Sequence, residues 1–216
     1  MIKYVNKEII FTNESILNVE TDVIVIPTNE RLLLNGYNMK HTKLTNKLTL
    51  IDDQLQNYLK EHYLEGCLPG HIKPAPINFN KFQNILFYVP SENLNVNVLS
   101  YIKCLSFIQL TRYNKISFQV NSEIDLIPML CSFYLWYKTN IKTNFVIELC
   151  YNRNNDVLEK YITDTEFLSS LNEIYNLDDM ENITTIKVFY NYCNYLLDLR
   201  KDNKICRNEI YPYIDD

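Results

Sequence analysis

Small residues are scarce in this sequence, which has three glycines and one alanine (Ala75) among 216 residues. Asparagine, isoleucine, lysine and tyrosine are abundant instead, and we interpret this bias as the codon usage of an AT-rich genome. No Walker phosphate-binding loop and no G-x-G-x-x-G dinucleotide loop is present, since both need clustered glycines. Paired carboxylates and nucleophile–base motifs are also missing, so the common enzyme classes receive no support.

Metal-ligand patterns are missing as well. The six cysteines stand far apart with no C-x-x-C pair, and the three histidines (His41, His62 and His71) show no ligand spacing. A zinc site is therefore not expected. We expect no metal and no cofactor, and we expect the cysteines to be buried free thiols in a reducing compartment.

Long apolar runs and basic clusters are absent too. No apolar stretch approaches the about 18 residues of a membrane-spanning helix, and the N-terminus has no signal-peptide core. The formal net charge of −5 argues against non-specific nucleic-acid binding, which needs clustered Lys and Arg. We therefore expect a cytoplasmic protein that binds neither membranes nor, non-specifically, nucleic acid.

The most informative stretch runs from Thr21 to Asn38. Val23–Ile26 is a continuous β-branched run that Pro27 ends, which is typical of a parallel strand buried on both faces. A polar loop containing Gly36 follows it. Because ligands in open α/β sheets bind at the carboxyl ends of strands, this loop is the first candidate for a binding site.

Strand and helix patterns alternate along the first 162 residues. We predict further strands at Glu8–Phe11, Asn84–Val89, Lys115–Val120 and Asn144–Cys150. We predict helices at Leu50–Glu65, Leu94–Tyr113, Met129–Tyr137 and Asp156–Ile162. This alternation favours an α/β domain with a mostly parallel sheet.

The first of these helices has capping signals and one histidine on its apolar stripe. Thr49 and Asp52 are expected to cap its start and Gly66 to end it, with Cys67–Pro76 as a rigid loop after it. His62 fits a satisfied, half-buried histidine better than a ligand contact.

The segment Ser15–Asn38 resembles the first motif of the macrodomain family, whose pattern is roughly G-D-I-T…A-I-V-N-A-A-N-x-x-L-x-x-G-G-G-V. Aligned without gaps, Ile24 and Val25 fall on I-V, Asn29 falls on the last Asn of N-A-A-N, and Leu32 falls on the Leu. The resemblance covers about residues 1–162. It implies a three-layer α/β/α fold with a mixed, mostly parallel sheet.

The same resemblance implies a site for ADP-ribose or a related nucleotide. Its ligand-binding residues would be Asn29, Asn35, Gly36, Tyr37, Gly70 and Ser122, with Ser15 and Ile16 on the adenine side. Gly70 belongs to a C-x-x-G stretch that the family has at a comparable place, although a helix terminator followed by a rigid loop explains that stretch equally well. Asn29 is the candidate for a ribose hydroxyl, because its amide both donates and accepts.

This chain departs from the macrodomain pattern where the ligand is held. Ser15 stands in place of the Asp that holds adenine, and Ile26 in place of the first Asn of N-A-A-N. The family's diphosphate loop resembles P-x-I-S-T-G-x-x-G-x-P, of which Ser122 and Pro128 are present and both glycines are not. Since a phosphate cradle needs close backbone approach, we expect weak binding of ADP-ribose at most.

The tail 163–216 has no counterpart in the family pattern. We predict a mainly helical extension that packs on the domain formed by residues 1–162. A tyrosine-rich surface for a protein partner is the alternative.

Two functions follow from these observations. The first is binding of ADP-ribose, a related nucleotide or an ADP-ribosylated target, without efficient catalysis. Any catalysis would resemble ADP-ribosyl hydrolysis, and the acidic residues near the expected cleft are Glu14, Asp22, Glu30 and Glu123. The second is a degenerate macrodomain scaffold that acts through protein–protein contact with no nucleotide ligand.

Overall fold

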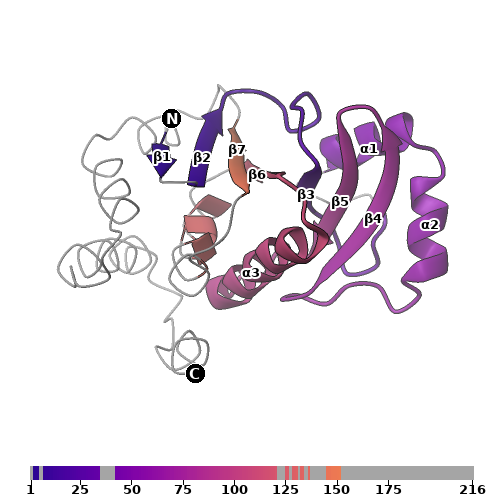
Figure 1. Ribbon diagram of the computed structural model, residues 1–216. Coiled ribbons are helices and arrows are strands. Elements are labelled where there is room, and N and C mark those ends of the chain that lie inside the picture. Colours follow the sequence, from indigo (N-terminus) through magenta and orange to yellow (C-terminus); the bar gives the residue numbers. More distant parts are fainter. Residues whose placement is uncertain are drawn as a thin grey trace.

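The computed structural model describes residues 2–4, 7–34, 42–120, 125–126, 128–130, 132–133, 136 and 145–151. Their strands form one seven-stranded sheet in the order β1-β2-β7-β6-β3-β5-β4, which Figure 1 shows from β1 at the left to β4 at the right. The strands are β1 (Ile2–Tyr4), β2 (Lys7–Thr12), β3 (Val23–Pro27), β4 (Ile72–Phe79), β5 (Phe82–Tyr88), β6 (Lys115–Val120) and β7 (Val146–Tyr151). The helices are α1 (Thr42–Ile51), α2 (Leu55–His62) and α3 (Leu94–Thr111).

The sheet is mixed and mostly parallel, as the sequence predicted. The inner strands β2, β7, β6, β3 and β5 pair in parallel, and the outer strands β1 and β4 pair antiparallel to their neighbours. The predicted strands correspond to β2, β3, β5, β6 and β7, whereas β1 and β4 were not predicted.

The predicted central strand is confirmed. β3 pairs with β5 on one side and β6 on the other, and all five of its residues are buried. Val23 and Val25 belong to the core on one face of the sheet, and Ile24 and Ile26 belong to the core on the other. Apolar side chains on both faces keep this strand in the interior.

Helices cover both faces and complete three layers. α3 packs on one face through Tyr101, Leu105 and Ile108, together with helical residues between 125 and 136. α1 and α2 cover the other face beside β5 and β4, where Leu48 and Leu55 are buried (Figure 1). The predicted α/β/α arrangement is therefore confirmed.

The helix predicted over Leu50–Glu65 is wrong in one respect, because the chain forms two helices there. Between α1 and α2, Asp52 Oδ1 accepts the backbone N–H of Gln54 at 3.0 Å. A short side chain that bonds to a nearby backbone group favours a turn over a continuous helix.

The predicted caps of that helix are also corrected. The Thr49 hydroxyl donates to the carbonyl of Asn46 at 2.8 Å, inside α1, so it caps no helix start. α2 ends at His62, which leaves Gly66 beyond the helix.

The predicted loop over Cys67–Pro76 extends only to His71. From Ile72 the chain forms β4, the last strand of the described sheet. Pro74 and Pro76 fit there because an edge strand has N–H groups that no neighbour needs.

Several predictions concern residues outside the described ranges. They include the extension at 163–216 and the helix at 156–162. Within the described part of the chain, no helix is long and apolar enough to cross a membrane.

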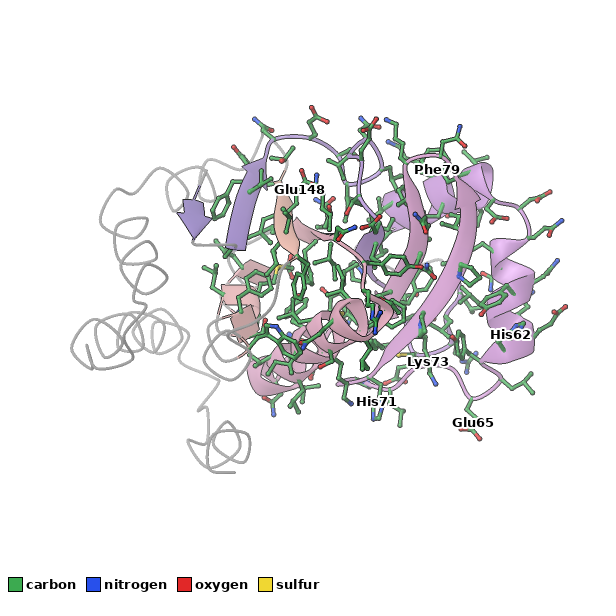
Figure 2. The ribbon with its side chains drawn as sticks, viewed as in Figure 1. His62, Glu65, His71, Lys73, Phe79 and Glu148 are labelled. Atoms are coloured by element: carbon green, nitrogen blue, oxygen red, sulfur yellow. The ribbon has the colours of Figure 1, made fainter. Side chains whose placement is uncertain are left out.

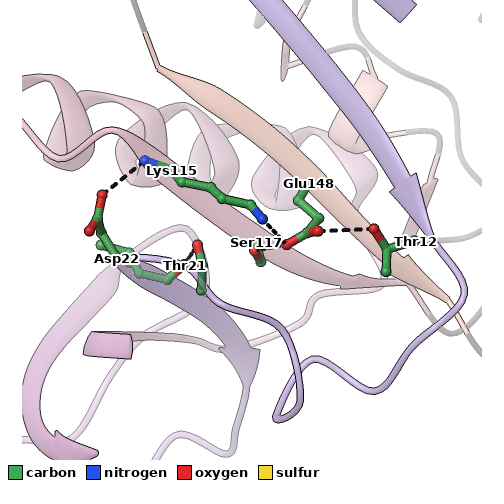
Figure 3. Close-up of polar contacts among 7 residues, drawn as sticks. Thr12, Thr21, Asp22, Lys115, Ser117 and Glu148 are labelled. Carbon is green, nitrogen blue, oxygen red and sulfur yellow. Dashed lines mark hydrogen bonds and ion pairs between the residues drawn. The ribbon is translucent and has the colours of Figure 1, made fainter. Parts of the chain in front are cut away.

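A buried carboxylate connects β2, β7 and β6. Glu148 of β7 is 4 % exposed, and its carboxylate accepts the hydroxyls of Thr12 at 2.9 Å and Ser117 at 2.6 Å. Lys115 Nζ lies 3.1 Å from the same carboxylate (Figure 3). Because a buried carboxylate is tolerated only when it is paired and hydrogen-bonded, all three partners stabilise this part of the sheet.

We predict that Lys115→Met lowers the free energy of unfolding by about 2–4 kcal/mol, because it leaves Glu148 buried without its counter-ion. The double variant Lys115→Met/Glu148→Gln should recover part of this loss, since a neutral amide is cheaper to bury. Urea unfolding of the single and double variants measures both values. Equal stability of Lys115→Met and the wild type would contradict the network's role.

Candidate functional site

The parallel strands β2, β3, β5, β6 and β7 all end at one edge of the sheet, which we call the carboxyl edge. The described segments that follow β2, β3 and β5 begin there, and ligands of open α/β sheets bind at such an edge. The loop 28–34 after β3 and the connection 63–71 between α2 and β4 both lie at this edge.

The side chain of Asn29 shapes the loop 28–34. Its Nδ2 donates to the carbonyl of Leu33 at 2.8 Å, and its Oδ1 accepts the backbone N–H of Leu33 at 3.0 Å. Leu32 N–H donates to the carbonyl of Asn29 at 2.9 Å. The amide proposed for a ribose hydroxyl is thus oriented by its own loop.

Buried leucines and a glutamine from α2 hold the far end of this loop. Leu32 and Leu34 are buried. Leu32 has a φ of 53°, which a non-glycine residue adopts only when its surroundings require it. Gln56 accepts the N–H of Leu34 at 2.8 Å and donates to the carbonyl of Leu32 at 3.3 Å. These bonds fix the strained turn.

The connection 63–71 presses directly against the loop 28–34. The N–H of Cys67 donates to the carbonyl of Glu30 at 2.7 Å. Gly66 has a φ of +74°, and a Cβ at this position would lie 2.0 Å from the same carbonyl oxygen. Only glycine therefore allows this close approach of two backbones.

We predict that Gly66→Ala lowers the free energy of unfolding by about 3–5 kcal/mol, because a left-handed backbone and a backbone clash combine. Gly70→Ala is the matched control. Gly70 has a similar φ of +81°, but its Cβ would meet only Val96 Cγ1 at 3.4 Å. The control should cost about 1–2 kcal/mol in chemical denaturation. Equal losses in the two variants would contradict the close contact.

Gly70 and the helical residue Asp125 lie at the same edge. The carbonyl of Gly70 accepts Lys103 Nζ from α3 at 2.7 Å. Tyr88 ends β5, and its hydroxyl meets that of Tyr101 at 2.9 Å. Burial raises the pKa of Tyr88, and the nearby charge of Asp125 raises it further. Of the predicted ligand-binding residues, Asn29 and Gly70 therefore lie at the same edge of the sheet.

Comparison with known proteins finds similarity to solved structures. No family model and no curated protein matches the chain. The Oceanobacillus iheyensis macrodomain with MES bound matches with a TM-score of 0.59 and 16 % identity over 76 % of this chain and 91 % of that one. The chain has the macrodomain fold.

Two other solved structures agree. The macro domain of ganglioside induced differentiation associated protein 2 (GDAP2) matches with a TM-score of 0.57 and 14 % identity, over 80 % of this chain and 86 % of that chain. The Trypanosoma brucei macrodomain in complex with ADP-ribose matches with a TM-score of 0.56 and 13 % identity, over 77 % of this chain and 69 % of that chain. At such low identities, the likeness concerns the fold.

The residues proposed for the adenine side of a macrodomain site lie in the loop after β2. Ser15 is exposed, and its carbonyl accepts the N–H of Asn18 at 2.8 Å. Ile16 is fully buried with Ile26 and Leu32, so a ligand would meet its backbone and not its side chain. The other predicted ligand residues, Asn35, Gly36, Tyr37 and Ser122, lie outside the described ranges, as does Glu123.

Asp22, one of the acidic candidates, lies at the opposite edge. It precedes β3, and its Oδ2 accepts the N–H groups of Asn114 at 2.7 Å and Lys115 at 3.0 Å. The expectation that Asp22 lies near the cleft was wrong, because Asp22 lies at the amino end of β3 and the candidate site lies at the carboxyl end. Asp22 instead aligns the first residues of β3 and β6.

An open, polar hollow of about 360 Å³ lies at that amino edge. It is lined by Glu20, Thr21, Asp22, Asn80, Lys81, Phe82, Gln83 and Lys115. Its lysines are engaged, since Lys81 Nζ donates to the carbonyl of Asn18 at 2.8 Å and Lys115 pairs with Glu148. Ligand pockets are usually more enclosed and more apolar, so we assign no ligand to this hollow.

His62, at the end of α2, and His71, just before β4, do not form a site with Glu148. Figure 2 shows His62, Glu65, His71 and Lys73 around α2 and the start of β4, far from Glu148. His62 is exposed rather than half-buried, and its ring stacks on Tyr58 with 4.0 Å between centroids. Among the described residues, no group of His, Cys, Asp and Glu side chains is arranged to hold a metal ion.

The cysteines in the described ranges are unsuited to nucleophilic chemistry. Cys67, Cys104 and Cys150 are free and buried. Burial raises the pKa of each thiol, so each stays protonated and unreactive. Burial likewise raises the pKa of Tyr63 to about 12, and its neutral phenol donates to the carbonyl of Pro74.

Sequence reasoning missed two groups of polar residues. The first group is Glu148 and its partners. The signal available in the sequence was Glu148 itself, a charged residue within the apolar run of β7. No sequence signal singled out Thr28, which directly follows β3 and is 3 % exposed.

Proposed function

We propose that this protein binds ADP-ribose, a related nucleotide or an ADP-ribosylated target, with weak affinity and without efficient catalysis. The observation that supports the proposal is the macrodomain fold, since the Trypanosoma brucei macrodomain, which has this fold, is solved in complex with ADP-ribose and in complex with ADP. The ligand would lie at the carboxyl edge, over the loop 28–34 and near Gly70.

Weak affinity follows from what the carboxyl edge lacks. Ser15 offers a neutral hydroxyl where the macrodomain pattern has a carboxylate, and the exposed Glu14 and Glu30 repel phosphate. Efficient catalysis is not part of the proposal, because Glu14 and Glu30 are exposed and surface carboxylates are usually only solvated. Any residual activity would be ADP-ribosyl hydrolysis.

We predict that free ADP-ribose binds roughly two to four powers of ten more weakly than it would bind an intact macrodomain site. Losing the adenine carboxylate and the diphosphate N–H donors costs about 1–3 kcal/mol each. Calorimetry and thermal unfolding with increasing ADP-ribose measure the affinity. A concentration of 100 times Kd should raise the stability by about 2.7 kcal/mol. Micromolar or tighter affinity at physiological salt would show that the missing residues contribute little.

Replacing Asn29 tests the loop at the centre of the proposed site. We predict that Asn29→Ala weakens nucleotide binding by about 1–3 kcal/mol, because it removes an amide that shapes the loop and is proposed to meet a ribose hydroxyl. Asn80→Ala, in the hollow at the opposite edge, is the control and should bind as the wild type does. The assignment fails if Asn29→Ala and the wild type have the same affinity.

A protein-binding scaffold without a nucleotide ligand is the second candidate. Ser15 in place of the adenine-binding Asp favours it. A folded wild type that binds none of ADP-ribose, ADP and adenosine at millimolar concentration would support this candidate over the first. The tyrosine-rich segment 163–216 would then be the first part of the chain to test for a partner.

A further inference from the structure

Thr28 lies at the carboxyl edge with a hydrogen-bonding group that the protein does not use. Its backbone N–H donates to the carbonyl of Tyr88 at 2.8 Å, which extends the pairing of β3 with β5 by one residue. Its hydroxyl oxygen is buried and has no hydrogen-bond partner in the described part of the chain. Nearly all buried polar groups in native proteins are paired, so this exception needs a reason.

The threonine hydroxyls at the two ends of β3 differ in their hydrogen bonding. At the amino end the buried hydroxyl of Thr21 donates to the carbonyl of Val23 at 3.3 Å, so it serves the fold. At the carboxyl end the neighbouring Asn29 directs its amide to Leu33. The hydroxyl of Thr28 has no such internal use, and the macrodomain pattern has alanine at this position. The fold therefore does not require the hydroxyl.

We propose that Thr28 Oγ1 is a specificity-determining contact that hydrogen-bonds a sugar hydroxyl of the ligand, an inference that rests on the proposed nucleotide-binding function. A threonine hydroxyl both donates and accepts, which matches a sugar hydroxyl. A phosphate group fits less well, because Glu14 and Glu30 are exposed at the same edge. Thr28 is 3 % exposed, so the ligand has to displace the atoms that cover its hydroxyl.

The substitution Thr28→Val tests this role, because valine has the same shape and no hydroxyl. The full-length variant should unfold about 2–4 °C above the wild type without ligand, since an unpaired buried hydroxyl is removed. Its affinity for ADP-ribose and adenosine, from NMR titration, should fall about three- to tenfold, as expected for one lost hydrogen bond. Inorganic phosphate should show no difference between the two proteins.

Two variants serve as controls. Thr28→Ser keeps the hydroxyl and should bind within about twofold of the wild type, since the hydrogen bond is retained. Thr21→Val removes a hydroxyl that the fold uses, so it should lower the unfolding temperature and leave the affinity unchanged.

Each other outcome overturns the inference in a recognisable way. If Thr28→Val binds ADP-ribose and adenosine as tightly as a binding wild type, Thr28 is no ligand contact. If it unfolds at a lower temperature with unchanged affinity, the hydroxyl has a structural partner such as a buried water. A selective loss of phosphate binding would replace the sugar hydroxyl by an anionic group. A wild type that binds neither nucleoside-type probe contradicts the proposed function itself, and the inference with it.

Discussion

The burial of β3 on both faces is the constraint on which the rest of the structure depends. Its valines and isoleucines enter two separate cores, so the strand has to lie inside the sheet with helices above and below it. Asp22 fixes its first residues against β6, and Thr28 continues its pairing with β5 past Pro27. Because these hydrogen bonds fix both ends of β3, the loop 28–34 that follows it starts from a fixed position at the carboxyl edge.

That loop is built from local bonds and from one close backbone contact. Asn29 closes it from within, Gln56 holds its far end, and Gly66 allows the connection 63–71 to press on the carbonyl of Glu30. The chain has only three glycines, and one of them, Gly66, stands where no side chain fits. At the amino edge, Asp22 and Lys81 bond to backbone groups and Lys115 pairs with Glu148.

The parallel sheet could be predicted because each inner strand is a short apolar run ended by a proline or by polar residues. The division of the predicted helix into α1 and α2 depended on a turn at Asp52, and β4 was hidden by Pro74 and Pro76, which only an edge strand accepts. The candidate site was harder to predict. Asn29 came from a motif, whereas the unpaired state of Thr28 is a property of packing that no local pattern contains.

The central claim is that the carboxyl edge of a macrodomain fold binds a nucleotide, and backbone amide chemical shifts test it most directly. ¹⁵N-labelled protein titrated with ADP-ribose should show shifts concentrated in residues 13–16 and 28–34 and around residues 66–70. The amides of Thr21, Gln83 and Lys115 at the opposite edge should stay unchanged. Shifts centred on that opposite edge, or no shifts at millimolar ADP-ribose, would contradict the claim.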